Sequence, residues 1–135
     1  MPVVRIAPHQ TVLEAARSMA RMHVGSLLVA DEAGRTLGIF TERDLMVRVV
    51  AAGRIPSEVR IEEVMTRELY TTHPDRPILE VREDLRRRHI RHVPVVENEV
   101  VIAVLSQRDL MRAALEEQRH EVQEMTRYIQ GDSYM

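Results

Sequence analysis

The sequence predicts an α/β (α+β) fold made of two β-α-β-β-α repeats related by pseudo-two-fold symmetry, with an extended C-terminal helix. The first sign is a repeated phrase, because GIFTERDLM at residues 38–46 returns as AVLSQRDLM at residues 103–111, 65 positions later (103 − 38 = 65). Residues 11–30 also align with residues 77–96 at an offset of 66 (77 − 11 = 66). Two copies of one unit in the same order indicate an internal duplication.

We expect four segments along the chain: a first repeat at 1–53, a linker at 54–62, a second repeat at 63–114 and a C-terminal helical extension at 115–135. A repeat of roughly 60 residues is too small to bury a comfortable core alone. The two repeats are therefore expected to pack face to face about the pseudo-two-fold axis and to share one core.

Each repeat opens with a short extended piece that leads into a helix. The extended pieces are VVRIA and ELYTT, and Pro8 and Pro74 follow them. In the first helix the apolar residues recur at helical spacing; they are Val12, Ala16, Met19 and Ala20.

Two apolar runs come next in each repeat, SLLVA with LGIF and HVPVV with VVIAVL. Their lengths and branched residues favour the two strands of a hairpin, with DEAGR and ENE as the turns. A second helix begins at TERDLM or SQRDLM. In the first repeat it is expected to end near Gly53, because Pro56 follows shortly after.

Composition narrows the class of protein. The chain has 135 residues, 44% of them hydrophobic, and no cysteine, so disulfides and thiolate metal sites are excluded and a reducing cytoplasm is the natural home. No apolar run approaches the roughly 20 residues of a membrane helix, and the N-terminus lacks the regions of a secretory signal. We expect a soluble cytoplasmic protein with no membrane partner.

Charge argues against nucleic acid as a partner. The formal net charge is −2 and aromatic residues make up 3% of the chain, so neither a basic footprint nor a base-stacking surface is available. All 19 basic side chains are arginine. This reflects either codon bias or phosphate recognition, for which the forked guanidinium is suited.

The repeated phrase contains a helix-capping pattern. Thr41-x-x-Asp44 and Ser106-x-x-Asp109 each open a helix, and a hydroxyl at the N-cap followed three residues later by a carboxylate predicts a capping box. Capping alone is sufficient to explain these four residues.

Capping does not explain the arginine inside each pattern, Arg43 or Arg108. A cation in the first turn of a helix faces the positive end of the macrodipole. Its presence at both equivalent positions indicates that an anion such as a phosphate binds there. The alternative is a salt bridge to a nearby carboxylate such as Glu42.

The histidines favour structure over metal binding or catalysis. His23 and His89 are repeat equivalents at a predicted helix-to-strand corner, and the pair His89-x-x-His92 lacks further ligands. No catalytic triad order and no glycine-rich phosphate loop is present. We therefore expect neither a metal site nor an enzyme.

The order of elements, the VMT before the second repeat, the HIRHVPVV stretch and the phrases GIFTERD and AVLSQRD resemble a tandem pair of CBS motifs, often called a Bateman module, of the stand-alone bacterial or archaeal type. The resemblance covers roughly residues 3–114. It implies a regulatory module that needs no cofactor, is usually dimeric, and binds AMP, ADP, ATP or S-adenosylmethionine between its repeats.

In the first cleft the resemblance assigns Asp44 to the ribose hydroxyls, and Thr41 with Arg43 to the phosphate end. Ile39 would form an apolar wall. The base would be read from the opposite repeat, where the matching positions are Met65, Thr66, Tyr70, Ile90 and Arg91.

In the second cleft the equivalent residues are Asp109, Ser106 and Arg108, with Val104 as the apolar wall. Its base-side positions are Val4, Val24 and Gly25. The first repeat has no counterpart of VMT, so part of this lining is missing and the Asp44 cleft is expected to be the better formed. Arg91, which stands where this cleft has Gly25, either closes the Asp44 cleft or contacts phosphate.

A heptad seam follows the second repeat. Its residues are Met111, Leu115, Gln118, Val122, Met125 and Ile129. A continuous helix from Arg108 to Gln130 would extend roughly 35 Å. The seam either folds back on its own repeats or pairs two chains as a homodimer, with Gln118 setting the register.

Two functions are compatible with these sequence features. The first is a sensor of adenosine ligands that acts on an unknown regulated protein or rearranges its own dimer. The second is a dimeric scaffold whose clefts no longer bind ligand.

Overall fold

The structure is a computed structural model that describes residues 3–133, with side chains described as far as His120. The first repeat contains, in order, β1 (Arg5–Ile6), α1 (Val12–Met22), β2 (Ser26–Ala30), β3 (Thr36–Thr41), α2 (Glu42–Asp44) and a π-helix (Leu45–Val50). A 3-10 turn (Pro56–Glu58) and α3 (Ile61–Val64) lead to the second repeat, which contains α4 (Ile78–Arg88), β4 (His92–Glu97), β5 (Val100–Ser106) and α5 (Gln107–Ser133).

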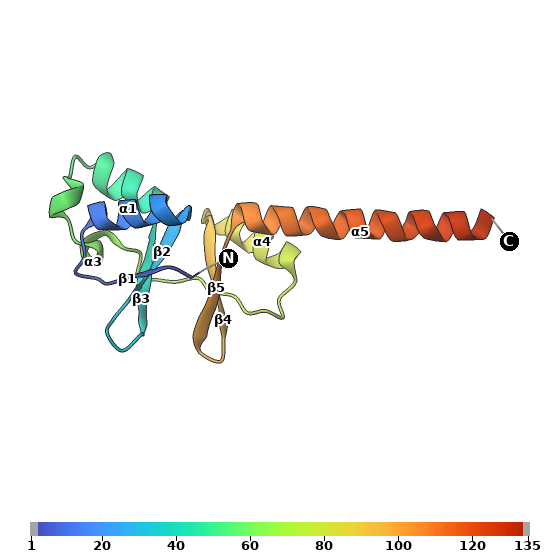
Figure 1. The fold of residues 1–135 in the computed structure, drawn as a ribbon, viewed down its shortest axis with the longest axis horizontal. Coiled ribbons are helices and arrows are strands. Elements are labelled where there is room, and N and C mark those ends of the chain that lie inside the picture. Colours follow the sequence, from blue (N-terminus) through green and yellow to red (C-terminus); the bar gives the residue numbers. More distant parts are fainter. Residues whose placement is uncertain (1–2, 134–135) are drawn as a thin grey trace.

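The two repeats lie side by side with their hairpins pointing in the same direction (Figure 1). The hairpins are β2–β3 and β4–β5, and the helices gather at the opposite end of the molecule. Helix α5 has 27 residues and leaves the second repeat as one continuous helix. The predicted order of elements is confirmed apart from the opening strand of the second repeat, and the extended C-terminal helix is confirmed.

Sheet pairing follows the predicted runs closely. Strand β1 is parallel to β2, with Arg5 opposite Leu28, and β2 is antiparallel to β3, with Leu28 opposite Ile39. In the second repeat β4 and β5 are antiparallel, with Pro94 opposite Val104. Leu28 and Pro94 are therefore equivalent positions in the two sheets.

The extended piece ELYTT is shorter than predicted. It contributes a single parallel bridge, Thr72 to Val95, instead of a strand. In the first repeat the N–H of Leu28 donates to the carbonyl of Val4 at 2.9 Å. The equivalent of Leu28 is Pro94, which has no N–H to donate, so the corresponding bond cannot form.

The buried face of α1 includes only some of the apolar residues that recur at helical spacing. Val12, Ala15 and Met19 are buried, whereas Ala16 is half-buried and Ala20 is exposed. Ala20 lies about 80° round the helix from Val12, on the side away from Ala15, so it leaves the core face. The helix predicted from the spacing of Val12, Ala16, Met19 and Ala20 is confirmed, and its most buried positions are Val12, Ala15 and Met19.

Both predicted helix-to-strand corners are formed by histidine. His23 and His89 adopt the left-handed conformation, with φ of 54° and 57°, and their N–H groups cap α1 and α4. This conformation ends the helix and turns the chain into the following strand. The structural role predicted for these two histidines is confirmed.

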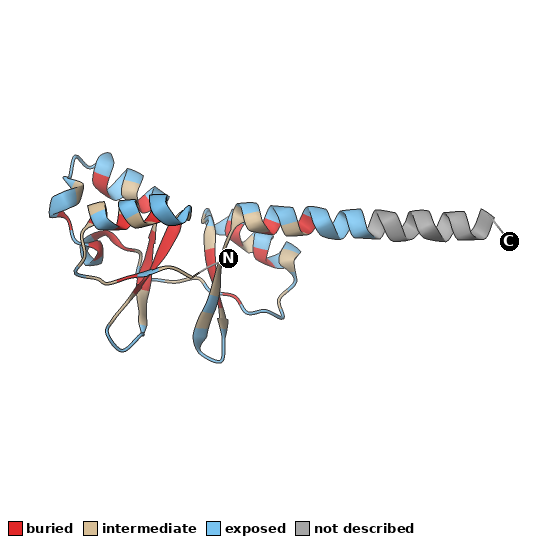
Figure 2. Cartoon of the chain, viewed as in Figure 1, coloured by how far each residue is buried: buried red, intermediate tan, exposed pale blue. Residues whose placement is uncertain are grey.

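The buried apolar side chains form two clusters, so the prediction of one shared core was wrong. Each repeat has its own buried residues along the ribbon (Figure 2). The smaller cluster, in the second repeat, contains Val81, Leu85, Val93 and Leu110. The larger one contains first-repeat side chains together with Val59, Ile61, Val64 and Met65. The segment that connects the repeats thus completes the core of the first one.

Among the described residues, no helix combines the length and the apolar character that crossing a membrane requires.

Candidate ligand-binding site

A cavity of about 770 Å³ lies where the first repeat faces the second. Its lining combines the start of the second helix, the segment that follows α3, and the corner before β4. The lining residues are Ile39, Thr41, Glu42, Arg43, Asp44, Met46, Val47, Arg48, Thr66, Glu68, Leu69, Tyr70, His89, Ile90, Arg91, His92 and Pro94.

The end of β3 forms the predicted capping box at this cavity. The N–H of Thr41 donates to Oδ2 of Asp44 at 3.1 Å, and the N–H of Asp44 donates to Oγ1 of Thr41 at 3.2 Å. The box holds the Asp44 carboxylate at the helix N-terminus, where a negative charge is favourable. Asp44 is 8% exposed, so its charge depends on these partners.

The segment after α3 pairs with the edge of β3. Ile39 donates to the carbonyl of Thr66 at 2.9 Å and accepts from the N–H of Thr66 at 2.8 Å. Gly38 makes this approach feasible, because a Cβ at that position would lie 2.6 Å from the Thr66 carbonyl oxygen. The glycine that opens GIFTERDLM therefore allows the segment after α3 to reach the site.

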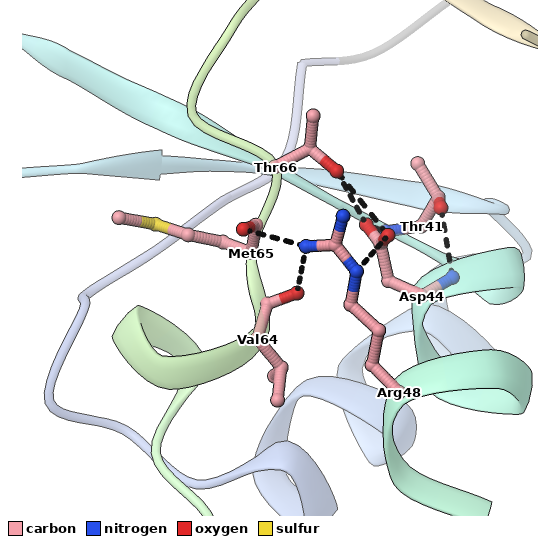
Figure 3. A network of polar contacts seen from close by, with 6 residues as sticks. All are labelled: Thr41, Asp44, Arg48, Val64, Met65 and Thr66. Carbon is pink, nitrogen blue, oxygen red and sulfur yellow. Dashed lines mark hydrogen bonds and ion pairs between the residues drawn. The ribbon is translucent and has the colours of Figure 1, made fainter. Parts of the chain in front are cut away.

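Asp44 is also linked to that segment through side chains (Figure 3). The hydroxyl of Thr66 donates to Oδ1 and Oδ2 of Asp44 at 3.2 Å and 3.4 Å. Nε of Arg48 lies 3.7 Å from Oδ1 of Asp44, and Nη1 of Arg48 donates to the carbonyls of Val64 and Met65 at 3.1 Å and 3.0 Å. One guanidinium thus joins the carboxylate to two backbone carbonyls.

Arg43 crosses from the first repeat to the second. Its Nη1 donates to the carbonyl of His89 at 2.8 Å, and it joins no ion pair with Glu42 or any other carboxylate of the described side chains. His89 caps the C-terminal end of α4, where the helix dipole is negative and a cation is favoured. The predicted alternative of a salt bridge to Glu42 was therefore wrong, and the contact that replaces it lies 46 residues away in the chain.

Tyr70 is held rigidly at the wall of the cavity. Its hydroxyl donates to Asp84, Nη1 of Arg76 donates to the Tyr70 oxygen at 2.7 Å, and the guanidinium of Arg88 lies 4.2 Å from the ring centroid. The hydrogen bonds from Tyr70 and then from Arg76 lower the pKa of Asp84, so this carboxylate stays ionised. Tyr70 therefore connects the cavity to α4.

His92 lies between the two predicted clefts. A Cβ on Gly25 would lie 3.0 Å from its Nε2 and 2.1 Å from Oε1 of Glu42, so both side chains cover this glycine. Burial lowers the pKa of His92, the charges of Glu42 and Asp109 raise it, and Arg91 lowers it. The imidazole is therefore favoured in its neutral form.

Most of the residues predicted for the first cleft line the cavity; they are Ile39, Thr41, Arg43, Asp44, Thr66, Tyr70, Ile90 and Arg91. Met65 does not line it, because its side chain belongs to the first core cluster. Only the Met65 carbonyl takes part in the network, as the acceptor of an Arg48 hydrogen bond.

None of the residues predicted for the second cleft lines this cavity; they are Val4, Val24, Gly25, Val104, Ser106, Arg108 and Asp109. The capping box is nevertheless present, because Ser106 N–H donates to Oδ2 of Asp109 at 2.9 Å and Asp109 N–H donates to Ser106 Oγ at 3.1 Å. Val4 and Val24 pack against the first core cluster instead.

Several residues that line the cavity were not predicted from the sequence, above all Arg48, His92 and Glu68. Arg48 had a detectable signal, because it follows Asp44 by four residues and so lies on the same helix face. His92 and Glu68 had no such signal. Among the described side chains, no group of three or more His, Cys, Asp or Glu residues is arranged to hold a metal ion.

The fold and the site define a tandem-repeat module with a ligand-sized cavity between its repeats. The chain belongs to the CBS domain family, whose profile matches residues 1–51 and 61–116. Proteins built from CBS-domain pairs are generally regulatory, and they bind adenosine-type ligands in several solved structures.

Known proteins similar to this chain carry the same pair of domains. A mitochondrial CBS domain-containing protein of Arabidopsis thaliana, CBSX3, is 34% identical over 125 residues, which cover 90% of this chain and 61% of the relative. The CBS domain protein PAE2072 from Pyrobaculum aerophilum, complexed with AMP, is 30% identical with a TM-score of 0.75, covering 87% of this chain and 91% of that one.

The CBS domain pair of protein MJ0100, in complex with 5-methylthioadenosine and S-adenosyl-L-methionine, is 26% identical with a TM-score of 0.75. The match covers 87% of this chain and 91% of that one.

Proposed function

We propose that the chain is a regulatory module that binds an adenosine-type ligand, AMP, ADP, ATP or S-adenosylmethionine, in the cavity at Asp44. One observation carries this proposal: a capped, nearly buried carboxylate and a base-side backbone segment face the same cavity from different repeats. Its volume of about 770 Å³ lies within the range of small-molecule sites, roughly 300–1,000 Å³. The AMP and S-adenosylmethionine complexes of similar structures support the ligand class.

Each part of such a ligand has a matching group. Asp44 accepts hydrogen bonds from the two vicinal ribose hydroxyls, which take the place of the Thr66 hydroxyl that it binds now. The base lies against Ile39 and Ile90, next to the backbone of the segment after α3. Tyr70, fixed by its hydrogen bonds, closes this side.

Arg91 is the leading candidate for phosphate recognition. Arg91 lines the cavity, and its guanidinium has no hydrogen bond or ion pair among the described residues, so its donors are available to a ligand. Arg43 donates to the His89 carbonyl in this structure and can turn one further N–H towards the same phosphate. Arg91 and Arg43 would then both bind the phosphate, the kind of anion that the sequence indicated.

Binding regulates only if the ligand has different affinities for two states of the protein. A ligand that contacts both repeats favours the arrangement in which they close around it. We propose that this change reaches a regulated protein or a second copy of the chain. The role is one of binding and signalling, without catalysis.

The surface that receives a second copy begins on α5. Met111 and Leu115 are 48% and 51% exposed, although both are large apolar side chains on the predicted seam. The remaining apolar positions, Val122, Met125 and Ile129, have side chains outside the described residues. Truncation after Glu116 is expected to convert a dimer into a monomer in light scattering, and a persisting dimer would exclude the seam as its cause.

A thermal-shift and calorimetry panel with AMP, ADP, ATP and S-adenosylmethionine tests the ligand proposal. At least one ligand is expected to raise the melting temperature at millimolar concentration. Asp44→Ala is expected to abolish the shift, and the repeat-equivalent Asp109→Ala, the matched control, to leave most of it. If no ligand shifts the wild type while light scattering shows a dimer, the scaffold function is favoured.

A further inference from the structure

Arg48 occupies a distinctive place in the network around the cavity (Figure 3). Its Nε faces the Asp44 carboxylate at 3.7 Å, and its Nη1 donates to the carbonyls of Val64 and Met65. Those two carbonyls directly precede Thr66, which pairs with β3 and donates to the same carboxylate. The guanidinium therefore touches both the ribose side and the base side of the site.

The geometry points to Arg48 as a positioning residue that fixes Asp44 and the segment 64–66 relative to one another, and so makes recognition of the ribose hydroxyls specific. This inference rests on the proposed adenosine-ligand function. A carboxylate that accepts from two vicinal hydroxyls must present both oxygens at set angles. An arginine suits this task, because its planar fork holds several acceptors in fixed directions.

The duplication offers an internal comparison. The position equivalent to Arg48 in the second repeat is Ala113 (48 + 65 = 113), so Asp109 has no such partner. The helix differs as well, because residues 45–50 form a π-helix whereas the equivalent residues 110–115 belong to the regular helix α5. π-Helical turns are rare and occur often at functional sites.

The π-helix and Arg48 therefore distinguish the Asp44 cleft, whose residues line the cavity, from the Asp109 cleft, whose predicted residues do not line it. The π-helix begins directly after Asp44, with Ala51 N–H donating to the carbonyl of Met46 at 2.8 Å across five residues. The Thr41–Asp44 box is common to both repeats, so it cannot account for the difference.

The test compares AMP, 2′-deoxy-AMP and adenosine by calorimetry on the wild type, Arg48→Ala and Arg48→Lys. Arg54→Ala is the matched control, because Arg54 pairs with Glu63 at 2.8 Å and does not line the cavity. Arg48→Ala is expected to weaken AMP binding about tenfold, a typical cost of one charge-assisted contact. The same substitution should weaken the binding of 2′-deoxy-AMP much less. The preference of the protein for AMP over 2′-deoxy-AMP therefore becomes smaller.

Arg48→Lys keeps the charge without the fork and is expected to retain part of the preference, and it serves as the second variant if Arg48→Ala fails to fold. Arg54→Ala should change neither affinity nor preference. Equal weakening of AMP and 2′-deoxy-AMP would indicate a merely structural role and overturn the inference. Loss of AMP binding with adenosine unchanged would indicate a direct phosphate contact and overturn it as well.

Failure of the proposed function gives a different result from failure of this inference. If the wild type binds none of the three ligands, the proposed function falls and the role of Arg48 falls with it. If the wild type binds AMP and every variant keeps the same preference, the inference about Arg48 alone is overturned.

Discussion

Substitution of Gly38 by alanine tests how the site is assembled. The added Cβ would lie 2.6 Å from the carbonyl oxygen of Thr66, and ordinary contact begins at 3.4 Å, so the segment must move by 0.8 Å (3.4 − 2.6 = 0.8). Thr66 is held to Ile39 by hydrogen bonds of 2.9 Å and 2.8 Å, which this movement stretches beyond normal length. Met65, in the first core cluster, moves with it.

The cost follows from these contacts. Each weakened hydrogen bond removes about 1 kcal/mol of stability. An extra methyl group forced into a packed site costs about 1–3 kcal/mol in addition. Alanine restricts the unfolded chain more than glycine does, which restores about 0.4–1 kcal/mol. We expect Gly38→Ala to lower the free energy of unfolding by about 2–5 kcal/mol and to weaken AMP binding.

Urea denaturation followed by circular dichroism measures this change. The matched control is Ala103→Gly at the equivalent position of the second repeat (38 + 65 = 103), where the chain already has a methyl group. Its loss of stability should stay below about 1 kcal/mol. Wild-type stability and AMP affinity in Gly38→Ala would refute the proposal that the close approach of Thr66 builds the site.

Three further predictions concern single side chains. His23→Gly should raise the free energy of unfolding by about 1 kcal/mol, measured by urea denaturation, because glycine adopts the left-handed conformation of this cap without strain. Burial lowers the pKa of His92 below 6.5, so the unfolded chain binds the proton more readily and stability should fall as the pH drops through 6.5. Between about pH 7 and pH 5 the melting temperature should change less with pH for His92→Gln than for the wild type. The same pH dependence in both proteins would contradict this. Tyr70→Phe should weaken ligand binding, measured by calorimetry, because the ring loses its bonds to Asp84 and Arg76.

Local patterns made much of the structure predictable. The strands, the turns, the capping boxes at Thr41 and Ser106 and the corner histidines depend on neighbours within a few residues. Alignment of the two repeats then supplied the order of the elements. These features could be read from the sequence because their interactions are short in range.

The contacts between distant segments could not be predicted in the same way. The hydrogen bonds of Arg43 and Arg48 join residues 46 and 16–17 positions apart, and nothing in the sequence pairs them. The division into two core clusters was also hidden, because it depends on Val59 and Ile61 turning into the first repeat. Pro94 did carry a readable signal, since a proline at the position equivalent to Leu28 excludes one sheet hydrogen bond.

The central claim is that an adenosine-type ligand binds at Asp44, and a crystal structure of the protein grown with saturating AMP tests it most directly. We predict AMP in the cavity, with its ribose hydroxyls at about 2.7 Å from the Asp44 carboxylate and the Thr66 hydroxyl displaced from it. AMP bound at Asp109 alone, or bound at Asp44 without contact between the ribose and the carboxylate, would contradict the claim.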